Sequence, residues 1–185
     1  MRLFVALDLD DEARGAVAAL QQRVAKALGD SPSMKMVDPA HMHLTLAFLG
    51  AIAEPDAPAI VEALSRDIDL RPFAADFQGV GVFPPRGAPR VLWLGVGQGE
   101  SEITHLQQEV VRRLERLGTT LERRPFHPHL TLARWRTSRP ADRRLVPTVE
   151  SRAVARVAVD RVTLYQSRLS AAGPAYTALA RATLT

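Results

Sequence analysis

The chain of 185 residues contains no cysteine and no long hydrophobic run. Without a thiol it cannot form a disulfide, use a thiolate nucleophile or bind zinc through cysteine. This absence fits a reducing compartment, and we expect a cytoplasmic protein. The apolar run in the first ten residues is short and is interrupted by Asp8, so it predicts neither a signal peptide nor a membrane span.

The chain also lacks low-complexity tracts and any linker long enough to separate independent domains. Its hydrophobic fraction of 46% and charged fraction of 24% are ordinary for a soluble globular protein. A chain of this length can bury a core without disulfides or metals. We therefore predict a single domain over residues 1–185, and we expect a monomer.

The charge balance is basic, with a formal net charge of +4, and arginine dominates the basic residues. Clustered arginine suits phosphate, because its planar fork can hold two oxygens at once. The alternative is that these arginines only cover solvated faces. Ten of them lie between residues 112 and 144, in the second half of the chain: Arg112, Arg113, Arg116, Arg123, Arg124, Arg134, Arg136, Arg139, Arg143 and Arg144.

The most informative feature is a short motif, His-Leu-Thr-Leu-Ala, which occurs at residues 43–47 and again at 129–133. Side chains alternate between the two faces of a strand, so His and Thr share one face and the leucines share the other. Each copy therefore predicts a strand that buries its leucines and offers an imidazole and a hydroxyl. The alternative interpretation of either copy alone is a histidine used for packing or left on the surface.

Periodicity predicts an α+β fold built around these two motif strands. Helices are expected from Asp10 or Asp11 to about residue 28, from Pro55 or Asp56 to Ile68, and over 101–117. The segment 30–40, which contains Pro39, reads as a loop. Further strands are expected at 1–9, 72–82, 90–96, 152–166 (as one long strand or a bent pair) and 175–184.

The order strand, helix, motif strand occurs twice, once before His43 and once before His129. This duplication predicts two similar, interleaved lobes of antiparallel sheet with helices on the outside, related by a rough two-fold axis. Each lobe would supply one His-x-Thr-x strand, and the active-site groove would lie between the lobes.

Two histidines in one groove are suited to general acid–base catalysis near neutral pH. A neutral imidazole can take a proton from a nucleophile while an imidazolium gives one to the leaving group. In-line displacement at phosphorus needs those two groups on opposite sides. Thr45 and Thr131 can then donate hydrogen bonds to the non-bridging phosphate oxygens.

Metal binding is the competing interpretation, because His41 and His43, like His127 and His129, have a His-x-His spacing that can chelate zinc, copper or nickel. Apart from Asp38, no carboxylate residue lies beside either motif, although hydrolytic metal sites commonly include one. We therefore expect no metal and no other cofactor.

The paired motifs resemble those of the 2H phosphoesterase superfamily, and most of the chain resembles its RNA 2′,3′-cyclic phosphodiesterase branch, also called the 2′-5′ RNA ligase family. The similar segments are MRLFVAL at 1–7, VDP at 37–39, HLTLAFLG at 43–50, GVGVFP at 79–84, PRVLW at 89–93, RPF at 124–126, PHLTLAR at 128–134, LYQSRL at 164–169 and GPAY at 173–176.

This resemblance implies a bilobal α+β fold and a metal-independent hydrolase that opens an RNA terminal 2′,3′-cyclic phosphate to a 2′-phosphate. The reverse reaction would join RNA ends through a 2′-5′ link. It implies that His43 and His129 are catalytic, with His43 the acid and His129 the base. It also implies that Thr45, Thr131 and Arg134 bind the substrate phosphate.

Three departures or open points accompany the resemblance. Strict alternation puts Arg134 on the leucine face, unless the strand bulges or ends there. Met36 stands where the family often has tryptophan, and His41 and His127 are additional to the family motif. The expected partners are RNA ends, tRNA fragments among them, and no membrane. The alternatives are a non-catalytic module that binds RNA ends and a phosphodiesterase of small nucleotides.

Overall fold

In the computed structural model of the chain, the described residues are 1–28, 33–121, 125–146, 152–170 and 173–185. Arg123 and Arg124 of the predicted arginine cluster lie outside these ranges. None of the helices within them is both long enough and apolar enough to cross a membrane.

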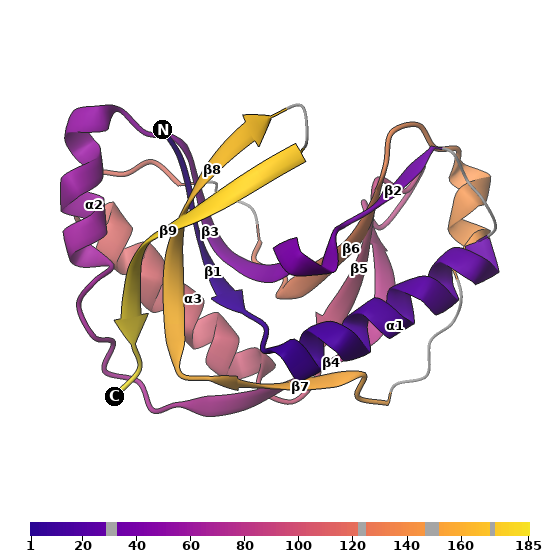
Figure 1. Cartoon of the computed structure of the whole chain (residues 1–185), viewed down its shortest axis with the longest axis horizontal. Helices are drawn as coiled ribbons and strands as arrows, with labels where there is room; N and C mark the ends of the chain where they lie inside the picture. The colour runs from indigo at the N-terminus through magenta and orange to yellow at the C-terminus, as the bar shows by residue number, and fades with distance from the viewer. Residues whose placement is uncertain (29–32, 122–124, 147–151, 171–172) are drawn as a thin grey trace.

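Nine strands, three α-helices and three short 3-10 helices make up the described part of the fold (Figure 1). The strands are β1 Arg2–Asp8, β2 Met34–Met36, β3 His43–Ala51, β4 Phe73–Phe83, β5 Val91–Val96, β6 His129–Trp135, β7 Ala155–Val159, β8 Arg161–Ser170 and β9 Gly173–Thr183. The helices are α1 Asp11–Leu28, α2 Ala57–Ala63, α3 Glu100–Glu115, η1 Pro39–His41, η2 Glu54–Asp56 and η3 Pro140–Leu145.

The strands form one curved sheet in the order β7-β4-β5-β6-β3-β1-β8-β9, with β2 also paired to β6. Every pairing between these strands is antiparallel, which confirms the predicted α+β class. The halves β9-β8-β1-β3 and β6-β5-β4-β7 meet where Leu44 of β3 pairs with Leu130 of β6. Beyond that pair β3 diverges, and β2 takes its place beside β6 (Figure 1).

The two halves repeat one connectivity, β1-α1-β3 in the first and β5-α3-β6 in the second. Their helices are exchanged, since α1 contacts β7 of the second half and α3 contacts β3 of the first. The division of one domain into two interleaved lobes stays a prediction, and this exchange of helices agrees with it.

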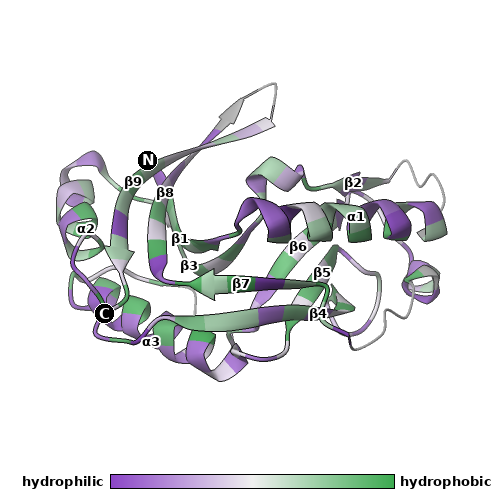
Figure 2. Ribbon diagram, turned by 60° about the horizontal axis from the view of Figure 1, so that its bottom comes forward, coloured by the Kyte–Doolittle hydropathy of each residue, from purple (hydrophilic) through white to green (hydrophobic). Residues whose placement is uncertain are grey.

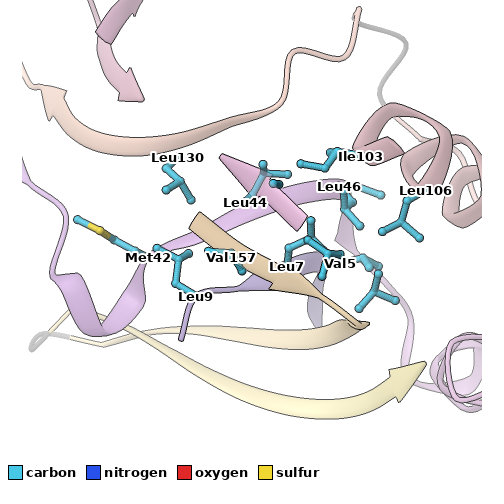
Figure 3. Packing of buried hydrophobic residues seen from close by; sticks show 14 of the residues in the cluster. Val5, Leu7, Leu9, Met42, Leu44, Leu46, Ile103, Leu106, Leu130 and Val157 are labelled. Carbon is cyan, nitrogen blue, oxygen red and sulfur yellow. The ribbon is translucent and has the colours of Figure 1, made fainter. Parts of the chain in front are cut away.

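Alternation along the central strands places the core on one face of the sheet. Leu3, Val5 and Leu7 of β1 are buried together with Leu44 and Leu46 of β3. Helix α3 covers this region with Ile103 and Leu106, and both side chains are fully buried (Figure 3). The polar members of the motif strands are therefore left on the opposite face.

Helix α1 begins where the sequence predicts, because the Asp10 carboxylate accepts a 2.8 Å hydrogen bond from the Ala13 amide. Its apolar stripe, which includes Val17, Leu20 and Val24, is buried, while charged and polar residues alternate with alanines along the rest of the helix (Figure 2).

Two predicted elements differ in the structure. Helix α2 ends at Ala63 rather than Ile68, because the apolar residues Leu64 and Ile68 are buried through an irregular turn. There the amide of Ile68 donates to the carbonyl of Thr183. The predicted loop 30–40 contains the short strand β2, whose pairing partner β6 lies about a hundred residues further along the chain, and the 3-10 helix η1.

We expect Leu44→Ala to lower the free energy of unfolding by about 2–5 kcal/mol, because its side chain is fully buried where the two halves of the sheet meet. Urea unfolding followed by circular dichroism would measure the change. Leu117→Ala is the control, since Leu117 is 43% exposed and we expect a loss of less than about 0.5 kcal/mol. Equal losses in the two variants would contradict the assignment of Leu44 to the core junction.

Candidate active site

The five residues predicted for the site line a single cleft of about 820 Å³. His43 and Thr45 come from β3, and His129, Thr131 and Arg134 come from β6. Their neighbours Leu44, Leu46, Leu130 and Leu132 are buried on the other face, so the predicted split of each motif strand into two faces is confirmed. The chemical roles of the five residues stay predictions.

The pairing of Leu44 with Leu130 sets the arrangement of the four polar motif residues. In an antiparallel pair with this register, His43 lies opposite Thr131 and Thr45 lies opposite His129. Directly opposite residues share a face, so two His–Thr pairs surround the junction of the sheet halves. The two motif strands therefore meet as neighbours in one sheet, with their imidazoles on a diagonal.

A β-bulge in the second motif strand, β6, explains the position of Arg134. Thr131 pairs with Trp93 and Ala133 pairs with Leu92, so Leu132 is the extra residue. Leu132 and Ala133 are both buried, and Arg134 returns to the cleft face, where it is exposed. The prediction from strict alternation is therefore wrong for Arg134, because the bulge adds one residue to the period.

The first motif strand carries the same bulge at the matching place. Thr45 pairs with Ala6 and Ala47 pairs with Val5, which leaves Leu46 as the extra residue. The position that matches Arg134 is Phe48, which lines the same cleft and is 44% exposed. The two halves thus offer an arginine and an aromatic ring at equivalent places.

Each motif histidine is anchored through its Nδ1 atom to the backbone two residues earlier. His43 Nδ1 lies 2.8 Å from the carbonyl oxygen of His41, and His129 Nδ1 lies 2.6 Å from that of His127. A carbonyl can only accept, so Nδ1 carries the proton and donates it. Nε2 is therefore the nitrogen available to a substrate, and His41 and His127 serve through their backbone carbonyls.

The pKa of both motif histidines is lowered, and burial is the main cause in each case. The hydrogen bond to the backbone carbonyl opposes this lowering of the pKa at both sites, and Arg134 adds to it at both. The Asp8 carboxylate also opposes the lowering of the pKa, but at His43 alone. At neutral pH these imidazoles can therefore act as bases.

Aromatic rings surround each histidine in an approximately equivalent way. Phe4 stacks on His43 with a centroid distance of 4.7 Å, and Tyr176 meets His43 edge-on at 5.4 Å. On the other side Phe83 meets His129 edge-on at 5.1 Å, and Trp93 lies 6.3 Å away. These rings bury the imidazole sides and fix their orientation, so each histidine has little rotational freedom.

The threonine hydroxyls remain available to a ligand. Among the described residues, neither Thr45 nor Thr131 has a side-chain hydrogen bond, and both line the cleft. In the described ranges, no group of three or more His, Asp or Glu side chains is placed to hold a metal ion. The cleft thus holds two imidazoles, two threonine hydroxyls and the cationic side chains of Arg134 and Lys35.

Sequence reasoning gave no role to several residues of this site. Lys35 of β2 pairs with Arg134 in register and lines the cleft, but its segment was predicted to be a loop. Phe48 and Tyr176 lie in segments that resemble the family, but no motif marks them as site residues. Asp8 was interpreted as a break in an apolar run, whereas its place in β1 opposite His43 gives it a position beside the site.

Comparison of the chain with known proteins identifies relatives over nearly its full length. A model of the 2′-5′ RNA ligase superfamily matches residues 9–170. The chain is 38% identical over 176 residues to the RNA 2′,3′-cyclic phosphodiesterase of Archaeoglobus fulgidus, covering 95% of this chain and 96% of that protein. It is 37% identical to the protein of the same name from Aeropyrum pernix, over 89% of this chain and 93% of the other.

Solved structures agree with this relationship. The protein TT0787 of Thermus thermophilus superposes with a TM-score of 0.79 at 32% identity, covering 100% of this chain and 98% of that chain. E. coli LigT complexed with 3′-AMP superposes with a TM-score of 0.81 at 29% identity, again over 100% and 98%. The described fold, its two His-x-Thr-x strands and these matches agree, and the chain belongs to the 2′-5′ RNA ligase superfamily.

Proposed function

We propose that this protein is an RNA 2′,3′-cyclic phosphodiesterase that opens a terminal cyclic phosphate to a 2′-phosphate without a metal ion. The observation that carries the proposal is the pair of imidazoles, each fixed through Nδ1, which line one cleft with two threonine hydroxyls and Arg134. The names of the related proteins from Archaeoglobus fulgidus and Aeropyrum pernix support this substrate.

In the proposed reaction a water oxygen attacks phosphorus as its proton passes to Nε2 of His129. The bond between phosphorus and O3′ breaks, and O3′ takes a proton from Nε2 of His43. The product carries a 2′-phosphate and a free 3′-hydroxyl. His129 then holds the additional proton and His43 lacks one, and exchange with solvent restores the starting state. A 5′-hydroxyl in place of water would form a 2′-5′ link by the same steps.

The phosphate itself assists the protonated state of the acid. A phosphodiester anion beside the imidazoles favours their charged form, which opposes the lowering of the pKa by burial. Thr45 and Thr131 donate to the non-bridging oxygens, and Arg134 supports the same charge. Phe48 offers an exposed ring on which a nucleobase can stack.

The test is hydrolysis of a synthetic oligoribonucleotide ending in a 2′,3′-cyclic phosphate, with EDTA present and with 2′- and 3′-phosphate products separated chromatographically. We expect turnover to the 2′-phosphate at the same rate with and without chelator. A 3′-phosphate product, or loss of activity in EDTA, would overturn the proposed reaction. Salt-sensitive binding of the oligonucleotide without turnover would instead favour a non-catalytic RNA-binding module.

Several finer points belong to the same proposal. The substrate is the end of an RNA chain, with tRNA fragments as candidates, rather than a free nucleotide. The cleft extends past the histidines to Lys35 and to Gln22 of α1, which would suit a longer chain. A cyclic mononucleotide should then react with a lower kcat/KM than an oligomer, and equal values would favour the small-nucleotide alternative.

We also infer that the protein acts as a monomer. We infer that it acts in the cytoplasm, in keeping with the absence of cysteine.

Arg134→Ala should lower kcat/KM for the cyclic-phosphate oligomer by about tenfold. The loss is moderate because Arg134 is exposed and its charge is partly screened by solvent. Arg134→Lys should retain part of the activity, since it keeps the charge but loses the fork. Steady-state kinetics would measure these values, with Arg66→Ala as the control because Arg66 is an exposed arginine paired with Glu62. An Arg134→Ala variant as active as Arg66→Ala would contradict phosphate binding.

A further inference from the structure

The two halves of the site share their strand pairing and their bulges but differ in the residue beside each histidine. In the first half Asp8 of β1 pairs with His43 of β3, and in the second half Gly95 of β5 pairs with His129 of β6. The bulges fall at the same place in both pairs, so Asp8 and Gly95 occupy equivalent positions. One histidine therefore has a carboxylate as its cross-strand neighbour, and the other has no side chain there.

The carboxylate of Asp8 is fixed by two hydroxyl groups of β8. Thr163 Oγ1 donates to Asp8 Oδ2 over 2.8 Å, and the Tyr165 hydroxyl donates to Asp8 Oδ1 over 2.7 Å. Burial, with the hydrogen bond to Asp8, raises the pKa of Tyr165 to about 12, so this donor stays a neutral phenol. Thr163 is fully buried. The negative charge is therefore held in one place near His43.

A side chain at the equivalent position, Gly95, would be crowded by its neighbours. A Cβ atom at Gly95 would lie 3.1 Å from the Trp93 ring and 3.2 Å from the carbonyl oxygen of Gln78. Both contacts are tighter than ordinary van der Waals contacts, and Trp93 is also held against Phe83. The packing of the second half thus disfavours a side chain beside His129, and Gly95 places no carboxylate there.

We propose that Asp8 is a positioning residue that makes His43, rather than His129, the protonated histidine at the start of the reaction. This inference rests on the proposed phosphodiesterase function, and it concerns which of the two imidazoles is the acid. Asp8 acts through space, since the Nδ1 atom of His43 is bonded to the carbonyl of His41. The acid would then be His43 at the leaving O3′, and the base would be His129 at the attacking water.

The charged groups around the two histidines agree with this assignment. His43 is influenced by Asp8, which favours its imidazolium, and by His41 and Arg134, which disfavour it. The charges that act on His129 are those of His127 and Arg134, and both disfavour the imidazolium. Around Asp8 itself the charged side chains are those of Asp10, Asp160, Arg161 of β8 and Arg181 of β9, which line one small pocket with it. Asp8 is therefore the negative charge that favours the imidazolium of His43, and His129 has no such influence.

The test is the pH dependence of kcat/KM for Asp8→Asn, which keeps the shape of the side chain and removes its charge. In a bell-shaped profile of kcat/KM, the acidic limb reports the pKa of the catalytic base and the alkaline limb reports the pKa of the catalytic acid. Loss of the carboxylate destabilises the His43 imidazolium, so His43 loses its proton at lower pH and the alkaline limb moves to lower pH. On that limb we expect kcat/KM to fall by about tenfold, with the acidic limb unchanged.

Matched variants separate charge from fold. Asp160→Asn also removes one carboxylate, but Asp160 pairs with Arg161 and has no influence on His43, so its profile should match the unmodified protein. Asp8→Glu restores the charge and should return the alkaline limb towards its original position. A shift of both limbs together, or equal profiles for Asp8→Asn and Asp160→Asn, would overturn the proposal.

Imidazole titration by nuclear magnetic resonance provides a readout that needs neither activity nor a variant. In the unmodified protein with inorganic phosphate bound, His43 should titrate at higher pH than His129. Asp8→Asn should then lower the midpoint of His43 and leave that of His129 in place. His129 titrating at the higher pH would overturn the role of Asp8. A protein that shows the expected titration but no hydrolysis of the cyclic phosphate would instead refute the proposed function.

Discussion

Replacing either His43 or His129 by glutamine is expected to lower kcat/KM for a cyclic-phosphate oligoribonucleotide by about 10²- to 10⁴-fold. Glutamine keeps a polar amide in the cleft but cannot exchange a proton near neutral pH. Without His129 the attacking water keeps its proton, and without His43 the O3′ oxygen must leave as an alkoxide. Binding of the substrate should change little, because the threonines and Arg134 remain in place.

The remaining histidines serve as internal controls. His127→Gln should stay within a few-fold of the unmodified protein, because residue 127 contributes its backbone carbonyl, which every residue has. His105→Gln should have no effect, since His105 is exposed on α3 and does not line the cleft. Thermal unfolding of each variant would verify the fold. Activity of His43→Gln or His129→Gln within tenfold of the unmodified protein would refute acid–base catalysis by this pair.

A double variant tests whether the two histidines act in one step. If proton transfer to His129 and from His43 accompany the same displacement, removal of one already abolishes the efficient path. The double variant should then lose far less than the product of the two single losses. Multiplicative losses would indicate that the histidines act in separate steps.

Alternation and helical periodicity were sufficient to predict most of the elements in this chain. The structure contains the strands predicted at residues 1–9 and 90–96, as β1 and β5, and the helices predicted around Val17 and Val110, as α1 and α3. Each of them has an apolar pattern, and the residues of that pattern are the ones that are buried. The motif strands were predictable for the same reason, since His and Thr at alternate positions leave two leucines for the core.

The features that escaped prediction depend on residues far apart in the chain. No local sequence pattern shows that β1 pairs with both β3 and β8. The place of Asp8 beside His43 depends on that pairing. At each bulge two consecutive residues are buried, Leu46 with Ala47 and Leu132 with Ala133. Alanine can lie on either face of a strand, so the sequence gives no sign of the bulge. For this reason alternation alone put Arg134 on the wrong face, and only the family resemblance placed it at the site before the structure did.

The threonines should produce the second largest effect. Thr45→Val or Thr131→Val is expected to lower kcat by about 10²- to 10³-fold, as is typical when one donor to a developing oxyanion is removed. Valine keeps the branched shape that suits a strand, so the fold and the pairing of β3 with β6 should persist. Thr→Ser at either position retains the hydroxyl and should keep most of the activity.

The register of the sheet makes a sharper form of this prediction possible. His43 lies opposite Thr131, and Thr45 lies opposite His129, across the pair Leu44–Leu130. Directly opposite side chains lie closer together than side chains two residues apart on one strand, so they should couple more strongly. A double-mutant cycle on kcat should therefore give a larger coupling for His43 with Thr131 than for His43 with Thr45. Equal couplings, or valine variants within fivefold of the unmodified enzyme, would show that the hydroxyls do not stabilise the transition state.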